Sequence, residues 1–123
     1  MARILLVDDD SDIREVLRDH LESAGHSVVE AQNGKVGMVV LGQNPCDLVI
    51  TDVYMPDGDG IEFITRLHEQ AEDLPIIAMS GGGSHDFGLH MLAVTSVLGA
   101  RAILAKPFNC DQLLQTVDRV LQH

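Results

Sequence analysis

Short apolar runs alternate with longer amphipathic stretches along this chain. Five runs have the length and composition of β-strands: residues 3–7, 27–31, 47–51, 75–79 and 101–105. The segment Leu48-Val49-Ile50 offers apolar side chains to both faces, which is typical of a strand covered by helices on each side. The pattern therefore predicts strands buried within a sheet.

The stretches between the strands have the apolar spacing of helices. The first helix is expected to have Ser11 or Asp12 as its N-cap and Gly25 as its stop. The last is expected to begin at Asn109, with Gln112 three residues later. Apolar residues at helical spacing support both: Ile13, Val16, Leu17, Leu21 and Ala24 in the first, Leu113, Val117, Val120 and Leu121 in the last.

Three more helices complete the alternation. One is expected at about 34–43, where three glycines make the propensity poor, and one at about 58–70. The last of these three, which is the fourth helix in chain order, runs from Leu89 to Leu98 and contains no Asp, Glu, Lys or Arg. Five strand–helix repeats in this order predict an α/β fold, a doubly wound (βα)5 parallel sheet with helices on both faces.

Polar residues gather where the predicted strands end. Asp8-Asp9-Asp10 follow the first strand, Asp52 the third, Ser80 the fourth, and Lys106-Pro107 the fifth. The carboxyl ends of parallel strands lie at one edge of a sheet, where ligands gather in such folds. These side chains are therefore predicted to share one edge.

If the first and third strands are neighbours, Asp8, Asp9 and Asp52 converge. Like charges at about 4–6 Å repel by roughly 3–4 kcal/mol per pair at an effective dielectric near 20. A hard divalent cation such as Mg²⁺ or Mn²⁺ would remove that cost. The alternative is that Asp8–Asp10 are solvated loop residues that cap the first helix.

Four motifs, in order, resemble those of the receiver domain of bacterial two-component response regulators, of the single-domain chemotaxis type, over essentially the whole chain. The residues that carry the likeness are Val7-Asp8-Asp9-Asp10 with Arg14, Thr51-Asp52-Val53-Tyr54-Met55-Pro56 with Gly58 and Gly60, Ser80-Gly81, and Lys106-Pro107-Phe108. The resemblance implies the flavodoxin-like strand order 2-1-3-4-5. It also implies a cis bond between Lys106 and Pro107.

The resemblance also implies the chemistry. Asp52 would be the phosphoacceptor, taking a phosphoryl group from a phosphohistidine of a histidine kinase or histidine phosphotransfer protein. Mg²⁺ or Mn²⁺ would be held by Asp8, Asp9, Asp52 and the backbone carbonyl of Tyr54. Lys106 would pair with the phosphoryl oxygens, and Ser80 would donate its hydroxyl to them. The signal would leave by the helix 4–strand 5–helix 5 face or by onward phosphotransfer.

Two positions depart from the family pattern. Ile103 stands where the fifth strand usually carries an aromatic residue, so the familiar aromatic switch is in doubt. The stretch from Ser80 to Lys106 is longer than usual and opens with Gly81-Gly82-Gly83. The uncharged fourth helix is expected to form a protein-binding or self-association surface.

Composition narrows the function classes. The formal net charge is −11, with 8 basic and 19 acidic residues, which argues against direct nucleic-acid binding. No run approaches a membrane span, and Cys46 and Cys110 stand far apart, as in a reduced cytoplasmic protein in which they are small buried side chains. Residues 1–123 are expected to form one receiver domain without an output domain.

Three rival functions use the same architecture. A Mg²⁺-dependent phosphohydrolase of the haloacid dehalogenase type would use Asp8 as nucleophile with Asp10 two residues on. A flavin or dinucleotide binder would need glycines where the first strand meets its helix, and here that place is acidic. A receiver-like scaffold that takes no phosphate is disfavoured because Asp9, Asp52, Ser80 and Lys106 are all present.

Overall fold

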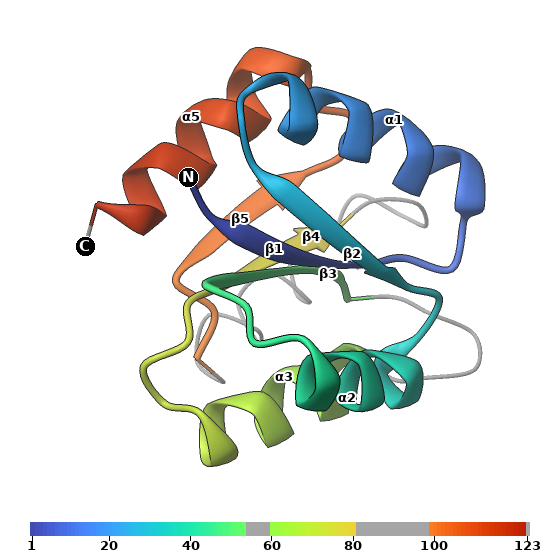
Figure 1. The fold of residues 1–123 in the computed structure, drawn as a ribbon, viewed down its shortest axis with the longest axis vertical. Helices are drawn as coiled ribbons and strands as arrows, with labels where there is room; N and C mark the ends of the chain where they lie inside the picture. The colour runs from blue at the N-terminus through green and yellow to red at the C-terminus, as the bar shows by residue number, and fades with distance from the viewer. Residues whose placement is uncertain (54–59, 81–98, 123) are drawn as a thin grey trace.

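The computed structural model describes residues 1–53, 60–80 and 99–122 and contains a parallel five-stranded sheet (Figure 1). The spatial order of the strands is β2-β1-β3-β4-β5, as the resemblance implied. The strands are β1 (Arg3–Val7), β2 (Ser27–Ala31), β3 (Leu48–Asp52), β4 (Ile76–Ser80) and β5 (Ala102–Ala105). The described helices are α1 (Ser11–Ser23), α2 (Gly34–Gln43), α3 (Gly60–Gln70) and α5 (Cys110–Leu121).

Helices cover both faces of the sheet, with α1 and α5 on one and α2 and α3 on the other (Figure 1). Side chains alternate along each strand between these two layers. Ile4 and Leu6 of β1 pack in the cluster that contains Leu21 of α1 and Val117 of α5. Leu5 and Val7 instead join the cluster that contains the α3 side chains Phe63, Ile64 and Leu67. The predicted doubly wound α/β architecture is confirmed.

The strands β3, β4 and β5 each begin one residue later than predicted, and β3 and β4 also end one residue later. Asp52 and Ser80 are therefore the last residues of their strands, where they had been expected just beyond them. The cause is the register: Asp52 lies opposite Met79, and Ser80 lies opposite Ala105. Backbone pairing thus holds both polar residues within the sheet.

The N-cap of α1 is Asp10, so the expectation of Ser11 or Asp12 was wrong by one or two positions. The Asp10 carboxylate accepts hydrogen bonds from the backbone N–H groups of Asp12, at 2.9 Å, and Ile13, at 3.3 Å. Asp10 keeps an extended backbone, which places its side chain over these free donors, while Ser11 already belongs to the helix. The alternative interpretation, in which the acidic residues are loop residues that cap the first helix, therefore holds for Asp10.

Helix α2 forms over the predicted range despite its glycines. A Cβ atom at Gly34 would lie 2.9 Å from Cβ of Phe63, and one at Gly37 would lie 3.0 Å from Cζ of the same ring. Glycine at these positions lets α2 approach α3 closely. The poor propensity of the helix is thus the cost of its packing.

The predicted capping box opens α5. Asn109 accepts a hydrogen bond from the backbone N–H of Gln112 at 2.8 Å, and the Gln112 side chain accepts one from the N–H of Asn109 at 2.9 Å. Two N–H groups that would otherwise lack a partner are thereby satisfied.

Replacing Asn109 by Ala is expected to lower the free energy of unfolding by about 1 kcal/mol, because the N-cap acceptor is lost. Urea denaturation followed by circular dichroism measures the change. Glu72→Ala, at an exposed position outside the described helices, serves as the control and should stay within about 0.5 kcal/mol of the unaltered protein. Equal stability of Asn109→Ala and the unaltered chain would show that the box contributes nothing.

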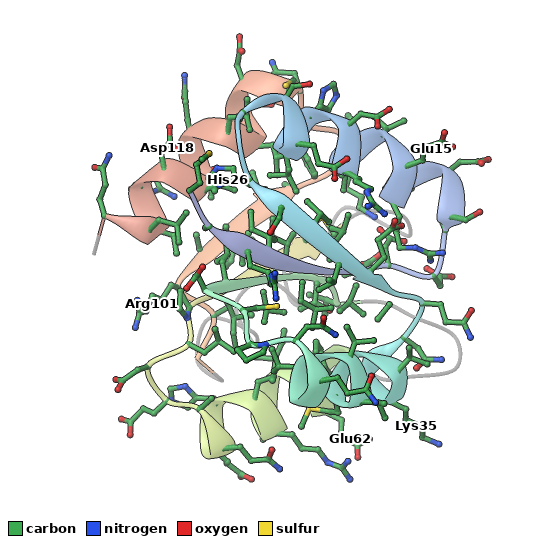
Figure 2. The ribbon with its side chains drawn as sticks, viewed as in Figure 1. Glu15, His26, Lys35, Glu62, Arg101 and Asp118 are labelled. Carbon is green, nitrogen blue, oxygen red and sulfur yellow. The ribbon has the colours of Figure 1, made fainter. Side chains whose placement is uncertain are left out.

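Several charged side chains of the helices point outward, as Figure 2 shows for Glu15, Lys35, Glu62 and Asp118. None of the helices in the described parts of the chain has the length and hydropathy of a membrane span. Cys46 and Cys110 are free and only half-buried, so the expectation of small buried side chains is met in part. Burial raises the pKa of the Cys46 thiol above its ordinary value.

Candidate functional site

Asp8 follows β1 directly and is held from several sides. Its backbone N–H donates to the carbonyl of Ala31 at 3.2 Å, which continues the pairing with β2. One carboxylate oxygen accepts the N–H of Asp10 at 2.9 Å, which closes a tight local turn. Only 1% of the residue is exposed. The acidic run therefore begins with a buried carboxylate in a fixed place.

Asp52 reaches the same place from the neighbouring strand. Strands β1 and β3 pair in parallel up to Val7 opposite Thr51, so the residues that follow them lie side by side. The N–H of Val53 donates to the carbonyl of Met79 at 3.0 Å, which fixes the end of β3 against β4. Carboxylate oxygens of Asp8, Asp9 and Asp52 lie within 4.8 Å of one another. The three carboxylates do converge.

Lys106 brings a cation to this group. Its Nζ lies 3.0 Å from Oδ2 of Asp52 and 3.2 Å from Oδ2 of Asp8. Burial acts to lower the pKa of this ammonium, but the charges and hydrogen bonds of Asp52 and Asp8 outweigh it, and the pKa is raised above its ordinary value. The ammonium is therefore protonated at neutral pH.

The backbone at the end of β5 fixes the position of the Lys106 ammonium. The backbone N–H of Lys106 donates to the carbonyl of Ser80 at 2.7 Å, which fixes the end of β5 beside β4. The bond between Lys106 and Pro107 is cis, as the resemblance implied. Residues from the ends of four strands thus contribute to one edge of the sheet.

The charges at this edge do not balance within the described residues. One ammonium faces three carboxylates, and each uncompensated pair at this separation costs roughly 3–4 kcal/mol. Asp8 and Asp52 are buried while Asp9 is exposed, so the cluster has one side open to solvent. A small set of carboxylates with room for water fits a hard divalent cation such as Mg²⁺ or Mn²⁺.

The structure describes some of the other residues predicted for the site and its switch, but not all of them. Ser80 is 7% exposed and ends β4, next to the strand that carries Asp52. Ile103, which stands where an aromatic residue is usual, is half-buried in β5. Tyr54, the loop at Gly81–Gly83 and the predicted helix at 89–98 lie outside the described residues, so the expectations about them remain predictions.

Sequence reasoning missed how the acidic turn is supported. The Arg14 side chain donates to the backbone carbonyl of Asp8, and its Nε donates to Glu30 at 3.1 Å. Arg14 had been noted only as part of the family likeness. The signal available was Glu30 itself, the one charged residue in the stretch that the pattern assigns to the second strand. A charged side chain in such a strand is expected to have a partner of opposite charge nearby.

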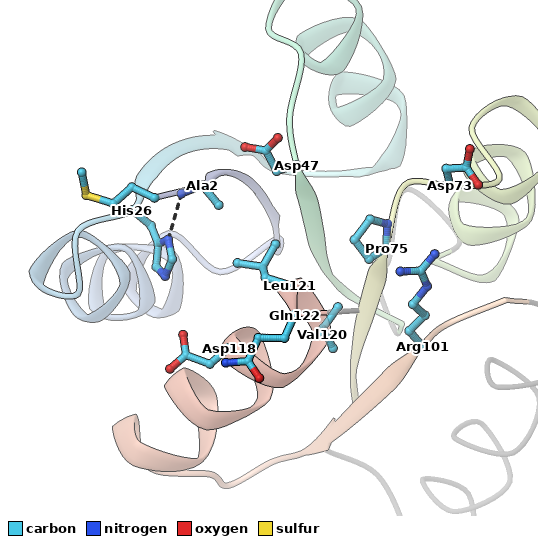
Figure 3. Close-up of a pocket in the computed structure, with 11 residues that line it drawn as sticks. Ala2, His26, Asp47, Asp73, Pro75, Arg101, Asp118, Val120, Leu121 and Gln122 are labelled. Carbon is cyan, nitrogen blue, oxygen red and sulfur yellow. Dashed lines mark hydrogen bonds between the residues drawn. The ribbon is translucent and has the colours of Figure 1, made fainter.

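A groove opens at the opposite, amino-terminal edge of the sheet (Figure 3). It is about 590 Å³ in volume, and its lining includes the residues that directly precede the five strands: Ala2, His26, Asp47, Pro75 and Arg101. The His26 ring accepts a hydrogen bond from the N–H of Ala2 at 3.2 Å. The acidic cluster therefore lies at the other end of the strands from this groove.

Gly60, the first residue of α3, lies against the strand end that carries Asp52. A Cβ atom there would lie 2.4 Å from the carbonyl oxygen of Val53 and 2.5 Å from that of Asp52. Both are backbone atoms, which cannot rotate away as a flexible side chain could. Only glycine fits this contact without moving the chain at Asp52.

Replacing Gly60 by Ala is therefore expected to lower the free energy of unfolding by about 1–3 kcal/mol, as overpacking does. Gly42→Ala is the matched control, because nothing lies within 4 Å of its Cβ position in α2, and it should raise stability by about 0.5 kcal/mol. Urea denaturation of the two variants measures both. A Gly60→Ala protein as stable as Gly42→Ala would contradict the close contact.

Comparisons with known proteins agree with this geometry. The family model described as "Response regulator receiver domain" matches residues 4–118. The C4-dicarboxylate transport transcriptional regulatory protein DctD of Pseudomonas aeruginosa is 37% identical over 98% of this chain, which spans 25% of that protein. The response regulator receiver protein CpdR of Brucella abortus is 36% identical over 98% of both chains.

Solved structures are similar over nearly the whole chain. The receiver domain of NtrX from Brucella abortus gives a TM-score of 0.90 at 26% identity and covers 97% of this chain and 98% of that one. Chemotaxis response regulator CheY4 of Vibrio cholerae gives 0.85 at 32% identity, with 98% of each chain covered. The first curated relatives are much longer, since this chain spans about a quarter of their length.

Proposed function

Because this chain belongs to the response regulator receiver domain family of two-component signalling, we propose that Asp52 accepts a phosphoryl group from a phosphohistidine of a partner protein. The partner would be a histidine kinase or a histidine phosphotransfer protein. The observation that carries the proposal is the position of Lys106, whose Nζ lies within 3.2 Å of both Asp52 and Asp8. A fixed cation beside a carboxylate nucleophile suits phosphoryl transfer.

The proposed reaction is a displacement at phosphorus. A carboxylate oxygen of Asp52 forms the new O–P bond, the P–N bond to the imidazole of the partner breaks, and its electron pair stays on the ring nitrogen. Negative charge on the phosphoryl oxygens would be stabilised by the Lys106 ammonium, which the strand end already holds. Ser80, at the end of β4, would donate its hydroxyl to the transferred group.

Asp8, Asp9 and Asp52 would hold the Mg²⁺, together with the backbone carbonyl of Tyr54, which lies outside the described residues. When bound, the ion supplies neutralisation of the charge shared by the carboxylates and the phosphoryl oxygens. The exposure of Asp9 leaves the open side through which water and substrate would enter.

The haloacid dehalogenase alternative receives no support. It needs Asp10 as a second reactive acid two residues after Asp8. The Asp10 carboxylate instead caps α1 through the N–H groups of Asp12 and Ile13, and the family shown by the comparisons is the receiver family. Asp10 therefore has a structural role.

The test is to locate the phosphoryl group. The protein is incubated with a small-molecule phosphodonor and Mg²⁺, and the modified peptide is identified by mass spectrometry after borohydride reduction of the acyl phosphate. We expect the label on Asp52, and a label on Asp8 would favour the hydrolase and overturn the proposal. Omission of Mg²⁺ should reduce the yield sharply, because charge neutralisation at the carboxylates is then lost.

A further inference from the structure

The Arg14 guanidinium joins three parts of the fold behind the acidic cluster. From α1 it donates to the backbone carbonyl of Asp8, at the end of β1, and to Oε1 of Glu30 in β2. Its side chain is only 16% exposed, so water competes little for these donors. The planar fork of a guanidinium suits two oxygens at once. Arg14 thus ties the start of the acidic turn to the neighbouring strand.

Glu30 is itself fixed in place. Its second oxygen, Oε2, accepts from Arg18 at 2.6 Å, and Arg18 also pairs with Glu22 at 3.3 Å. Glu30 precedes Ala31, whose carbonyl accepts the N–H of Asp8. The backbone of Glu30 is held by the sheet, where Glu30 lies opposite Leu6 of β1, so this anchor for Arg14 does not depend on Arg18.

The turn that Arg14 supports carries two of the proposed metal ligands. Asp8 is held by the guanidinium at its carbonyl, and Asp10 is held by the cap of α1 and by the N–H of Arg14 at 3.0 Å. Asp9 stands between them with an exposed side chain. Its position relative to Asp52 consequently depends on how firmly its two neighbours are held.

We propose that Arg14 is a positioning residue for the divalent metal and not one of its ligands, and that it sets Mg²⁺ affinity by holding the Asp8–Asp10 turn. The inference rests on the metal role proposed above for Asp8 and Asp9. Groups that orient metal ligands in this way typically change metal affinity by about 10–100-fold when removed.

Charge and positioning predict opposite signs for the loss of Arg14. Removal of a cation near an anionic site strengthens the attraction of that site for Mg²⁺, so an effect of charge alone would tighten binding. Loss of the hydrogen bond to Asp8 would loosen the turn and weaken binding. The sign of the change in affinity therefore separates the two mechanisms.

The experiment is calorimetric titration of the full chain with MgCl₂ at constant ionic strength and without phosphodonor. We expect Arg14→Ala to raise the Mg²⁺ dissociation constant by about tenfold. Arg14→Lys keeps the charge but loses the fork, and it should bind Mg²⁺ several-fold more weakly than the unaltered protein. Arg18→Ala, which removes a cation from the same network but makes no contact with Asp8, is the matched control and should bind within twofold of the unaltered protein.

Each outcome bears on the inference. Unchanged or tighter binding by Arg14→Ala, or full affinity in Arg14→Lys, would overturn it, as would equal weakening by Arg18→Ala. Circular dichroism at the titration temperature identifies the folded variants, and Arg14→Lys decides the matter if Arg14→Ala does not fold. Absence of Mg²⁺ binding by the unaltered protein would refute the proposed metal site. A Mg²⁺ dissociation constant that stays the same when Arg14 is replaced would refute the positioning role alone.

Discussion

Asp52→Asn is expected to abolish phosphoryl uptake, with no mass gain after incubation with a small phosphodonor and Mg²⁺. The amide has nearly the shape of the carboxylate but lacks the anionic oxygen that attacks phosphorus. Asp52 ends β3 with little exposure, and it is the one acidic residue of that strand, so β3 offers no other carboxylate that could take its place. Intact-mass spectrometry over a time course measures the loss.

The matched control for this variant is Asp10→Asn. Asn is as good an N-cap as Asp, so the start of α1 should be preserved, and phosphoryl uptake should remain at the level of the unaltered protein. Uptake that survives Asp52→Asn but disappears in Asp10→Asn would reverse the assignment in favour of the hydrolase.

Lys106→Met should produce the largest loss of stability, about 3 kcal/mol in the absence of divalent ions. Methionine keeps the length of the stem but removes the charge that faces Asp8 and Asp52, whose side chains are 1% and 8% exposed. Breaking a buried pair by removing one partner typically costs about 3–5 kcal/mol, because the buried carboxylates lose the compensation that the ammonium gave them. The lower end is expected, since the cluster is open on the side of Asp9.

Denaturation with and without Mg²⁺ tests the physical reason. The ion would neutralise the same carboxylates as the lost ammonium, so Mg²⁺ should stabilise Lys106→Met more than it stabilises the unaltered protein. Lys35→Met removes an exposed lysine from α2 and should change stability by less than about 0.5 kcal/mol in either condition. Equal responses of the two lysine variants would contradict the buried pairing.

The pH dependence of this contribution follows from the direction of the pKa shift. The folded-state pKa of Lys106 lies above its ordinary value, because Asp52 and Asp8 outweigh the effect of burial. Its stabilisation is therefore complete below the ordinary lysine pKa and is lost only as the pH rises through the raised value. Measurements near neutral pH report the full difference between the unaltered protein and Lys106→Met.

Local features were predictable where nearby residues decide them. The capping box at Asn109 joins residues three apart, and the strands lie within one residue of the apolar runs. The start of α1 was misplaced because Asp10, Ser11 and Asp12 are all good N-caps, and only the folded turn selects Asp10. The close approach of Gly34 to Phe63 could not be predicted from the sequence either, because it joins two helices that are far apart along the chain.

Hydrophobic periodicity by itself determined the alternation of strands and helices, because burial of apolar faces at periods of 2 and 3.6 residues is a property of each segment. It also placed Asp8, Asp52, Ser80 and Lys106 at strand ends. Only the tertiary structure decided that Lys106 bridges Asp8 and Asp52, and that Arg14 holds the turn from behind. These contacts depend on strand order and register, in which residues 98 and 54 positions apart meet at hydrogen-bond distance, and no local pattern specifies them.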